Sequence, residues 1–411
     1  MADWAAGFPY TFPITFSPFP PIIVAAGFSA NALDETPTWD ALEQYVQSVH
    51  VKRGRHHFLD RIEAGTCTLQ LRNTDDRFFP LNSAGPYYPN VLPGVPITVR
   101  TSYGGTSYHL FYGFAEDWGH DWVDPSQQRV PAVRLTAVDL FKPLALFLLN
   151  NAGYAQARVD ERLGSVLDSY GWPTVRRSFD TADTTVKATG TLTNENALNH
   201  LHVLAESEIG LIFVQPDGDV EIQHRYARQE APYSTVQATF GEDPGEQHYH
   251  GVELEGSDRF VRNDIRITRD GGTEQSASDS ASITKYGQRG FPRTGLLFLT
   301  DNEALDQANY FLSLYKSPVP RIKAIRIRPM RDPANLFPLV LGLDISARVV
   351  VRLDRAGLDH DYHIEGVEHR ISLYPQAWET TWWLTDADDQ AVWHIGTAGA
   401  SELGQTTVLG Y

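Results

Sequence analysis

Short β-rich runs separated by turn-forming residues fill two long stretches of this chain, and that pattern limits the fold more than any other feature. Runs of this kind, bounded by Gly, Pro, Asn or Asp, are typical of closed barrels and sandwiches. The first stretch holds them at 45–52, 66–71, 97–101, 108–113 and 130–137, and the second at 249–255, 261–269, 324–328, 345–353, 361–369 and 378–384. Because 411 residues are too many for one ordinary core, we expect several domains, with a barrel in each stretch.

Helical patterns occupy the region between the two stretches. Apolar residues recur every three or four positions over 159–170 and 195–209, and Asn194 precedes the second segment as a candidate N-cap. An Asp-Gly turn at 217–218 then joins two apolar runs, which predicts a β-hairpin. We therefore expect a small α+β domain over residues 146–235.

The second β-rich stretch contains two further features. A helical stripe over 302–315 predicts a helix that is capped by Thr300 or Asp301. The polar run at 276–282 is expected to be a mobile loop.

The two ends of the chain show neither a strand period nor a helix period. Residues 1–35 carry aromatic rings and prolines in irregular order, and residues 387–411 are rich in Ala, Gly and Thr. We interpret both ends as extended arms. The aromatic N-terminal arm is expected to dock, and the sequence leaves open whether it docks on another subunit or on its own chain.

Composition excludes several classes of function. The formal net charge of −17 argues against sequence-independent binding of nucleic acid, which depends on many Lys and Arg at phosphates. The single cysteine, Cys67, lies in an alternating run and is expected to be a buried small apolar residue. No apolar run has the length of a membrane-spanning helix, so no membrane span is expected.

No motif for catalysis or for a cofactor stands out. His248 with His250, and the segment 359–363, have a spacing that would put metal-binding side chains on one strand face, but such spacing is common by chance. Glu206 and Glu208 are two positions apart on a predicted helix and do not face each other. Phosphate-binding, dinucleotide-binding and nucleophile-elbow motifs are absent from the sequence. We therefore expect no enzyme activity, no cofactor and no metal.

Aromatic residues support one rival function, a carbohydrate-binding or cell-wall-degrading module. Tyr87 and Tyr88, and the group Trp378, Trp382 and Trp383, are of the type that stacks on sugars. The three tryptophans lie in a strand-like run, however, where burial in a core is the better interpretation.

A series of short motifs runs through the first β-rich stretch. They are Trp39-Asp40-Ala41-Leu42-Glu43-Gln44-Tyr45-Val46, Arg53-Gly54-Arg55, Leu59-Asp60-Arg61, Glu63-Ala64-Gly65, Leu71-Arg72-Asn73, Arg77-Phe78-Phe79-Pro80, Tyr87-Tyr88-Pro89-Asn90 and Phe111-Tyr112-Gly113-Phe114. Weaker likeness continues through 137–140 and 362–369. Together these segments resemble the minor tail proteins of long-tailed phages, over about residues 39–385.

The resemblance implies a baseplate hub of the phage tail tip. The implied fold is α+β and mainly β, with two tube-protein-like β-barrels at 36–145 and 236–386, an inserted α+β region at 146–235 and terminal arms at 1–35 and 387–411. Three copies would form a ring that connects the tail tube and the distal tail protein to the tip or fibre proteins. DNA would pass through the lumen without specific binding, and the ring would belong to the virion after synthesis in the host cytoplasm.

One alternative within the same class is the distal tail protein, which forms a hexameric ring with one barrel per copy. Two separate β-rich stretches favour the hub, although a hexamer stays open. The net charge of −17 further predicts a lumen that is lined by Asp and Glu.

Candidate residues for subunit interfaces come from the aromatic arm, from the basic turn at 52–57 and from the loop at 82–93. Exposed rings and arginines are enriched in protein interfaces. The candidates are Phe8, Tyr10, Phe12, Phe16, Phe19, Arg53, Arg55, Tyr87 and Tyr88.

Overall fold

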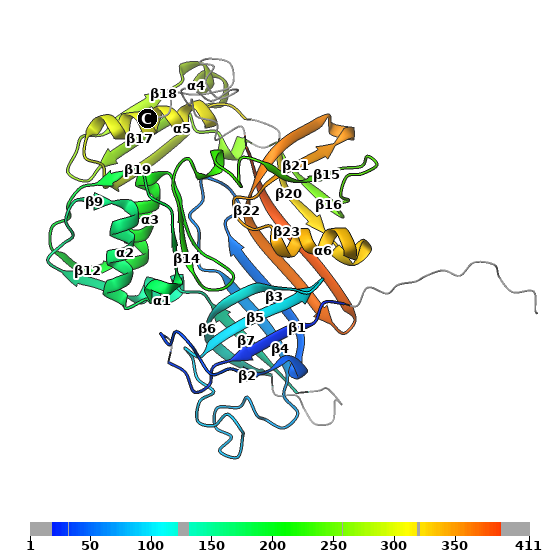
Figure 1. Cartoon of the computed structure of the whole chain (residues 1–411). Coiled ribbons are helices and arrows are strands. Elements are labelled where there is room, and N and C mark those ends of the chain that lie inside the picture. Colours follow the sequence, from blue (N-terminus) through cyan, green and yellow to red (C-terminus); the bar gives the residue numbers. More distant parts are fainter. Residues whose placement is uncertain (1–18, 32, 122–130, 257, 319–320, 388–411) are drawn as a thin grey trace, which may run out of the picture.

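A 13-stranded sheet is the largest element of the protein (Figure 1). The computed structural model describes residues 19–31, 33–121, 131–256, 258–318 and 321–387. The first β-rich stretch supplies β1 (Ile22–Ala26), β2 (Asp40–Ala41), β3 (Val46–Gly54), β4 (Thr66–Arg72), β5 (Pro96–Tyr103), β6 (Thr106–Asp121) and β7 (Ala132–Val138). The second supplies β15 (Val236–Phe240), β16 (Gly251–Glu255), β20 (Arg321–Ile327), β21 (Arg348–Leu353), β22 (Leu358–Leu373) and β23 (Gln376–Asp386). The predicted strands in both stretches are therefore confirmed, apart from shifts at their ends. The strand at 264–269 also forms, but it belongs to a separate three-stranded sheet.

The two halves of the sheet are joined where β3 pairs with β22. Strand β22 is long enough to pair with β21 through residues 358–363 and with β3 through residues 366–372. The strand order is β16-β20-β23-β22-β3-β4-β7-β6-β5-β1-β2, with β21 and β15 attached beside β22. Among the described residues the strand pairs leave the sheet open at β2, β15 and β16, so closed barrels stay a prediction.

One hydrophobic core spans both halves of the sheet. Strand β4 illustrates how it forms, because Cys67, Leu69 and Leu71 are buried while the alternate residues are not. Burial raises the pKa of the Cys67 thiol, as expected for a residue with a packing role. The same core includes Trp382 in β23 and Phe337 in helix α6 (Pro333–Gly342), a helix that the sequence analysis does not contain.

The N-terminal arm is shorter than predicted. Strand β1, which lies inside the predicted arm at 1–35, pairs with β5 over its whole length. Ile22, Val24 and Phe28 are buried in the core. This part of the arm therefore docks on its own chain, and residues 1–18 lie outside the described part of the structure.

An α+β lobe, residues 141–223, follows β7. Its elements are α1 (Phe141–Leu146), β8 (Leu148–Asn151), β9 (Ala157–Arg158), α2 (Val159–Tyr170), β10 (Arg177–Phe179), β11 (Thr185–Val186), β12 (Leu192–Asn196), α3 (Ala197–Glu208), β13 (Leu211–Val214) and β14 (Val220–Gln223). The predicted helix 159–170 and the predicted hairpin are confirmed, and Gly171 ends α2 in the left-handed conformation. The predicted cap of α3 is wrong by two residues, because the side chain of Asn196, not of Asn194, accepts from the N–H of Asn199.

A small lobe, residues 264–315, packs around a hydrophobic cluster of its own. It contains β17 (Asp264–Arg269), β18 (Gln275–Ser278), α4 (Ser280–Tyr286), β19 (Gly290–Leu296) and α5 (Asp301–Tyr315). The expectation of a mobile loop at 276–282 is wrong, because this segment ends β18 and begins α4, where Asp279 caps the helix. The predicted helix 302–315 is confirmed as α5, with Thr300 as its cap, but it packs on the three-stranded sheet β18-β17-β19 and not on the large sheet.

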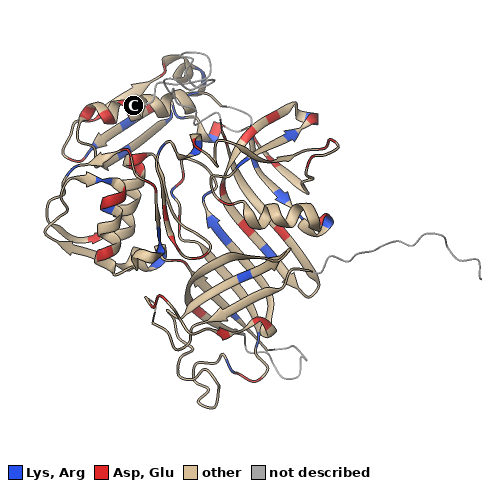
Figure 2. Ribbon diagram, in the orientation of Figure 1, with Lys and Arg blue, Asp and Glu red and all other residues tan. Residues whose placement is uncertain are grey.

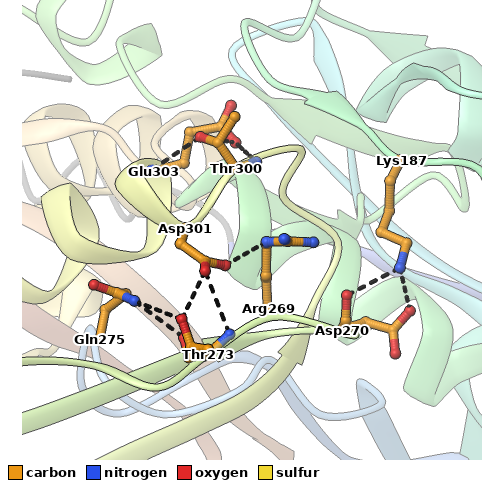
Figure 3. Close-up of polar contacts among 8 residues, drawn as sticks. All are labelled: Lys187, Arg269, Asp270, Thr273, Gln275, Thr300, Asp301 and Glu303. Carbon is orange, nitrogen blue, oxygen red and sulfur yellow. Dashed lines mark hydrogen bonds and ion pairs between the residues drawn. The ribbon is translucent and has the colours of Figure 1, made fainter.

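Polar contacts hold the small lobe to the α+β lobe (Figure 3). Lys187 Nζ donates to a carboxylate oxygen of Asp270 at 2.6 Å and to its backbone oxygen at 2.9 Å. The turn that carries Asp270 is tied to the start of α5, because Thr273 Oγ1 donates to Asp301 at 2.7 Å. The backbone N–H of Leu297 also donates to Ser207 Oγ of α3 at 3.0 Å. None of the helices in the described ranges has the length and apolar character needed to cross a membrane.

Candidate assembly surfaces and the buried junction

The join between the two halves of the sheet carries a row of charged side chains on its polar face. His50 of β3 contacts Glu368 of β22 at 2.6 Å, and Arg370 Nε donates to the same carboxylate at 2.7 Å. Burial alone would raise the pKa of Glu368, but the bonds from His50 and Arg370 outweigh it and lower the pKa to about 2. The carboxylate therefore links the halves in its charged form.

The other face of this join holds a buried junction of arginines and carboxylates. Arg53 Nη2 donates to both carboxylate oxygens of Asp344, at 2.7 and 2.8 Å. Glu365 is fully buried and accepts from Arg55 Nε at 2.7 Å and from Arg228. Burial opposes its charge, yet the two guanidinium groups prevail and lower the pKa of Glu365 to about 2.

This junction changes the interpretation of two candidate interface residues. Arg53 and Arg55 have side chains that are 6% and 9% exposed, and their partners come from the same chain. His57 of the same basic turn is also buried and stacks on Phe260 at 3.6 Å. We therefore assign Arg53, Arg55 and His57 to internal packing and do not carry Arg53 and Arg55 into the proposed interface.

The aromatic candidates divide into packed and exposed residues. Phe19 lies against Trp378, with ring centroids 6.0 Å apart, and Tyr87 stacks on Phe28 at 4.2 Å. Tyr88, in contrast, is 48% exposed. Phe8, Tyr10, Phe12 and Phe16 lie outside the described residues.

Tyr88 is one of three exposed apolar side chains on the loop between β4 and β5. Leu81 is 78% exposed and Leu92 is 52% exposed on the same loop. The loop is itself anchored, because Trp118 Nε1 donates to the backbone oxygen of Leu92 at 3.0 Å. An anchored loop that presents apolar side chains to solvent is a candidate docking surface.

The polar face of the large sheet carries charges of both signs. In the register of the strands, Lys52 lies opposite Glu368, and Glu368 lies opposite Thr381. The same face carries Lys52, Arg72, Arg134, Arg326 and Arg370 beside Asp117, Glu253, Glu368 and Glu379. Figure 2 shows blue segments along the strands of the sheet and red segments on the helices of the α+β lobe. The face is thus nearly balanced, although the chain as a whole is acidic.

The residues considered for metal binding or catalysis do not form a site. His363 is buried and contacts the backbone oxygen of Ser346 at 2.9 Å, while Asp361 pairs with Arg348. Glu208 accepts from the backbone N–H groups of Asp183 and Thr184. Within the part of the chain that the structure describes, no group of three or more His, Cys, Asp or Glu side chains is placed to hold a metal ion.

The tryptophan group of the rival interpretation lies in the interior. Trp378, Trp382 and Trp383 are 2%, 0% and 8% exposed. The predicted role in core packing is confirmed for Trp378 and Trp382, which belong to the core of the large sheet. Trp383 lies outside that core and is covered by His56, whose ring stacks on it at 4.2 Å. The three buried rings are not available to stack on a sugar.

Sequence reasoning missed the carboxylates of the buried junction. Glu365 stands in the alternating β22 segment among apolar residues, which is an unusual place for a charge. A charge at such a position indicates that Glu365 has a partner inside the protein, but it does not identify Arg55 and Arg228 as the partners.

Comparison with known proteins places the fold among tail proteins. No protein-family model matches the chain, and no curated protein matches it by sequence. The structure is similar to a tail protein from Neisseria meningitidis MC58, with a TM-score of 0.60 and 13% identity over 89% of this chain and 96% of that one. It is also similar to the 43 kDa tail protein of prophage MuSo2 from Shewanella oneidensis, with a TM-score of 0.59 and 14% identity over 90% and 99% of the two chains. Prophage tail protein gp18 from Listeria monocytogenes EGD-e follows, with a TM-score of 0.50 and 12% identity over 88% and 94%. The resemblance to phage tail proteins that the motifs indicate is therefore confirmed at the level of the fold.

Proposed function

We propose that this chain is a structural component of a phage tail and forms the hub of the tail tip. The observation that carries the proposal is the similarity of nearly the whole fold to two tail proteins, over 89% and 90% of this chain. The chain spans almost the full length of both, so the comparison concerns the complete architecture and not one common module. We propose no enzymatic role.

Two β-rich halves in one chain support a trimeric hub over a hexameric ring. Three copies would supply six such halves around a passage, which matches a sixfold tail tube to a threefold tip. In this proposal the halves at 36–145 and 236–386 close the ring as tube-like barrels. The α+β insertion at 146–235 would lie outside the ring.

The polar face of the sheet is our candidate for the lining of the passage. It carries threonine and glutamine side chains, such as Thr68 and Gln70, among charges of both signs. The acid-rich lining that the net charge predicts is therefore revised to a balanced one. A balanced polar face would let DNA pass without specific binding, because sustained attraction to phosphates requires a clear excess of cations.

The proposed docking surfaces are the arms and the exposed loop. We keep residues 1–18 and 387–411 as arms that contact neighbouring tail proteins, namely the distal tail protein, the tail tube and the tip or fibre proteins. Tyr88 with Leu81 and Leu92 would add a second contact surface. The chain would act in the virion after synthesis in the host cytoplasm.

Labelling tests the proposed location. A peptide tag inserted after Gly357, in a turn with open space around it, leaves the core intact. Antibody against the tag should mark one end of purified tails, at the tip. Label along the whole tube, or tails that lack the protein, would overturn the proposal.

Arm function is tested by replacing Phe8, Tyr10, Phe12 and Phe16 with serine together. This variant should fold as a subunit but fail to enter tails, because the proposed contact of the arm with neighbouring proteins depends on these aromatic rings. The matched control is Tyr374→Ser, at a turn residue that is 82% exposed. Normal tails from the arm variant would refute the role of the arm.

A further inference from the structure

A small pocket lies where the basic turn, helix α3 and the small lobe meet. Its volume is about 50 Å³, and its lining includes Arg55, Arg61, Glu206, Arg293 and Phe311. The pocket adjoins the Leu59-Asp60-Arg61 motif, which the proposed tail function does not use. Three arginines in one small pocket are unusual for a chain with a net charge of −17.

Arginines outnumber carboxylates in the two ion-pair groups that meet at this pocket. In one group Glu206 lies between Arg61, at 2.8 Å, and Arg293, at 4.0 Å. In the other group Glu365 lies between Arg55 and Arg228. Each group holds two guanidinium ions and one carboxylate, so each has one positive charge in excess.

The remaining acidic side chain in the lining is Asp60. It is exposed, and the atom that Arg55 Nη1 contacts, at 3.3 Å, is its backbone oxygen. His202 also lines the pocket, and burial lowers its pKa, so it adds no positive charge near neutral pH. The excess of cations therefore stands after all titratable groups of the lining are included.

Two of the guanidinium groups have unused hydrogen-bond donors. Arg55 has a side chain that is 9% exposed, and its Nη2 is buried without a hydrogen-bond partner among the described residues. Arg293 is 13% exposed, and its distance of 4.0 Å from Glu206 is too long for a hydrogen bond. Buried donors without partners are costly, which favours a ligand that accepts hydrogen bonds.

The Arg293 guanidinium packs beside two aromatic rings. Its Cζ lies 5.0 Å from the ring centroid of Phe291 and 5.1 Å from that of Phe311. Burial lowers the pKa of Arg293, which reflects the desolvation of a cation that is only partly compensated. A desolvated guanidinium is well suited to binding oxyanions through paired N–H donors.

We propose that this pocket binds one free inorganic oxyanion of the size of phosphate or sulfate, between Arg55, Arg61 and Arg293. A cavity needs about 10–15 Å³ to hold one water, so about 50 Å³ accommodates a few waters or one tetrahedral oxyanion. Such an ion joins the basic turn of the first β half to the small lobe, and it stabilises the position of that lobe. The inference does not depend on the proposed tail function.

Inorganic phosphate and the purified full chain provide the test. At constant ionic strength, phosphate should raise the melting temperature of the chain above its value in chloride, because a ligand of the folded state stabilises it by mass action. Titration calorimetry then gives the affinity for phosphate and for sulfate. Acetate serves as the carboxylate comparison and should have a smaller effect.

Three variants separate the pocket from general charge effects. Arg61→Gln, at a side chain that is 44% exposed, should weaken phosphate binding about tenfold or more. Glu206→Gln removes the competing carboxylate and should tighten phosphate binding about tenfold. The matched control is Arg266→Gln in the small lobe, whose side chain is 47% exposed and pairs with Asp264 and Glu274, and it should bind like the unmodified chain.

The opposite results would overturn the proposal. They are an absence of any phosphate or sulfate effect beyond that of chloride in both the unmodified chain and Glu206→Gln, or equal losses in Arg61→Gln and Arg266→Gln. Circular dichroism establishes that each variant is folded. If Arg61→Gln fails to fold, Glu206→Gln still tests the proposal, because this variant is predicted to bind phosphate more tightly than the unmodified chain.

Discussion

Gly54 of β3 and Gly366 of β22 are register partners at the point where the two halves of the sheet join. A Cβ atom on Gly54 would lie 2.4 Å from the backbone oxygen of Glu365, and one on Gly366 would lie 2.6 Å from the backbone oxygen of Arg55. Gly54 also has a φ of +85°, which side-chain-bearing residues rarely adopt. The close approach of these two backbones brings the first and second β-rich stretches into one sheet.

Replacing Gly54 with alanine should therefore destabilise the whole sheet. The clash with backbone and the strained φ together predict a loss of at least about 2 kcal/mol in the free energy of unfolding, measured by chemical denaturation. Gly357→Ala is the matched control, since Gly357 has a φ of +63° and open space around it, so only about 1 kcal/mol should be lost. Equal losses in the two variants would show that close packing at the join is unimportant.

Neutralising Glu365 should be among the most damaging single changes in the chain. Glu365→Gln leaves Arg55 and Arg228 buried with an uncompensated charge, and breaking a buried pair of this kind costs about 3–5 kcal/mol. Glu379→Gln breaks the more exposed pair with Arg328 and should cost less than about 1 kcal/mol. Denaturation curves of both variants measure the difference, and a loss from Glu365→Gln as small as that from Glu379→Gln would contradict the described junction.

Acid should destabilise the fold well above the pH at which most carboxylates titrate. Burial is the main cause that lowers the pKa of His57, His363 and His369 to about 3 each, whereas an unfolded histidine has a pKa of 6.5. The unfolded chain thus binds more protons between pH 6.5 and 3, so the melting temperature should fall as the pH drops through this window. Burial raises the pKa of Asp139 from 3.8 to about 7, which has the opposite sign between those values, and it also raises the pKa of Asp180, Asp219 and Glu221. More histidines shift the other way, because burial also lowers the pKa of His200 to about 4 and lowers the pKa of five further histidines, so the histidines prevail.

A histidine variant checks the origin of this pH dependence. His369→Gln removes one buried titrating group and should flatten the decline of melting temperature with acid. His360→Gln, at an exposed position, should leave the slope unchanged. An identical slope in all three proteins would exclude the buried histidines as the cause.

The segment 22–28, which is strand β1 and the turn after it, should be required for folding although it lies in a region without clear periodicity. Phe28 is 6% exposed, stacks on Tyr87 at 4.2 Å and lies 5.7 Å from the ring of Trp118. Phe28→Ala should cost about 3–5 kcal/mol of unfolding free energy. Tyr374→Ala, at a residue that is 82% exposed, should change it by no more than about 0.5 kcal/mol, and similar values for both would place the segment 22–28 outside the core.

Local patterns in the sequence predicted the elements better than their pairing. Helices α2 and α5 were predictable because each combines an apolar stripe with one terminal signal, which is Gly171 after α2 and Thr300 before α5. Helix α6 was not predictable, because its mostly apolar residues show no helical period. Pro333 begins the helix and Pro338 lies inside it, where proline is unfavourable. The prediction of a loop at 276–282 failed for a related reason. A cap residue and small polar residues are typical of loops as well as of helix starts, and only their tertiary contacts distinguish the two.

Long-range partners explain why the candidate interface was only partly predictable. Arg53 and Arg55 bind carboxylates that are 291 and 310 positions away in the chain, and no local pattern relates such residues. The joining of two β-rich stretches into one sheet has the same origin, because the β3–β22 ladder connects residues 48–54 to 366–372. Tyr88 is exposed, as expected for its loop, whereas the packing of Tyr87 depends on Phe28, which lies in the turn after β1.

Electron cryo-microscopy of the tail tip measures most directly how many copies surround the passage and what each contributes. The proposed hub predicts a ring of three chains, in which every chain places both β-rich halves around the passage and gives sixfold pseudo-symmetry. A ring of six chains that each contribute one half, or a chain that lies outside the ring, would contradict it.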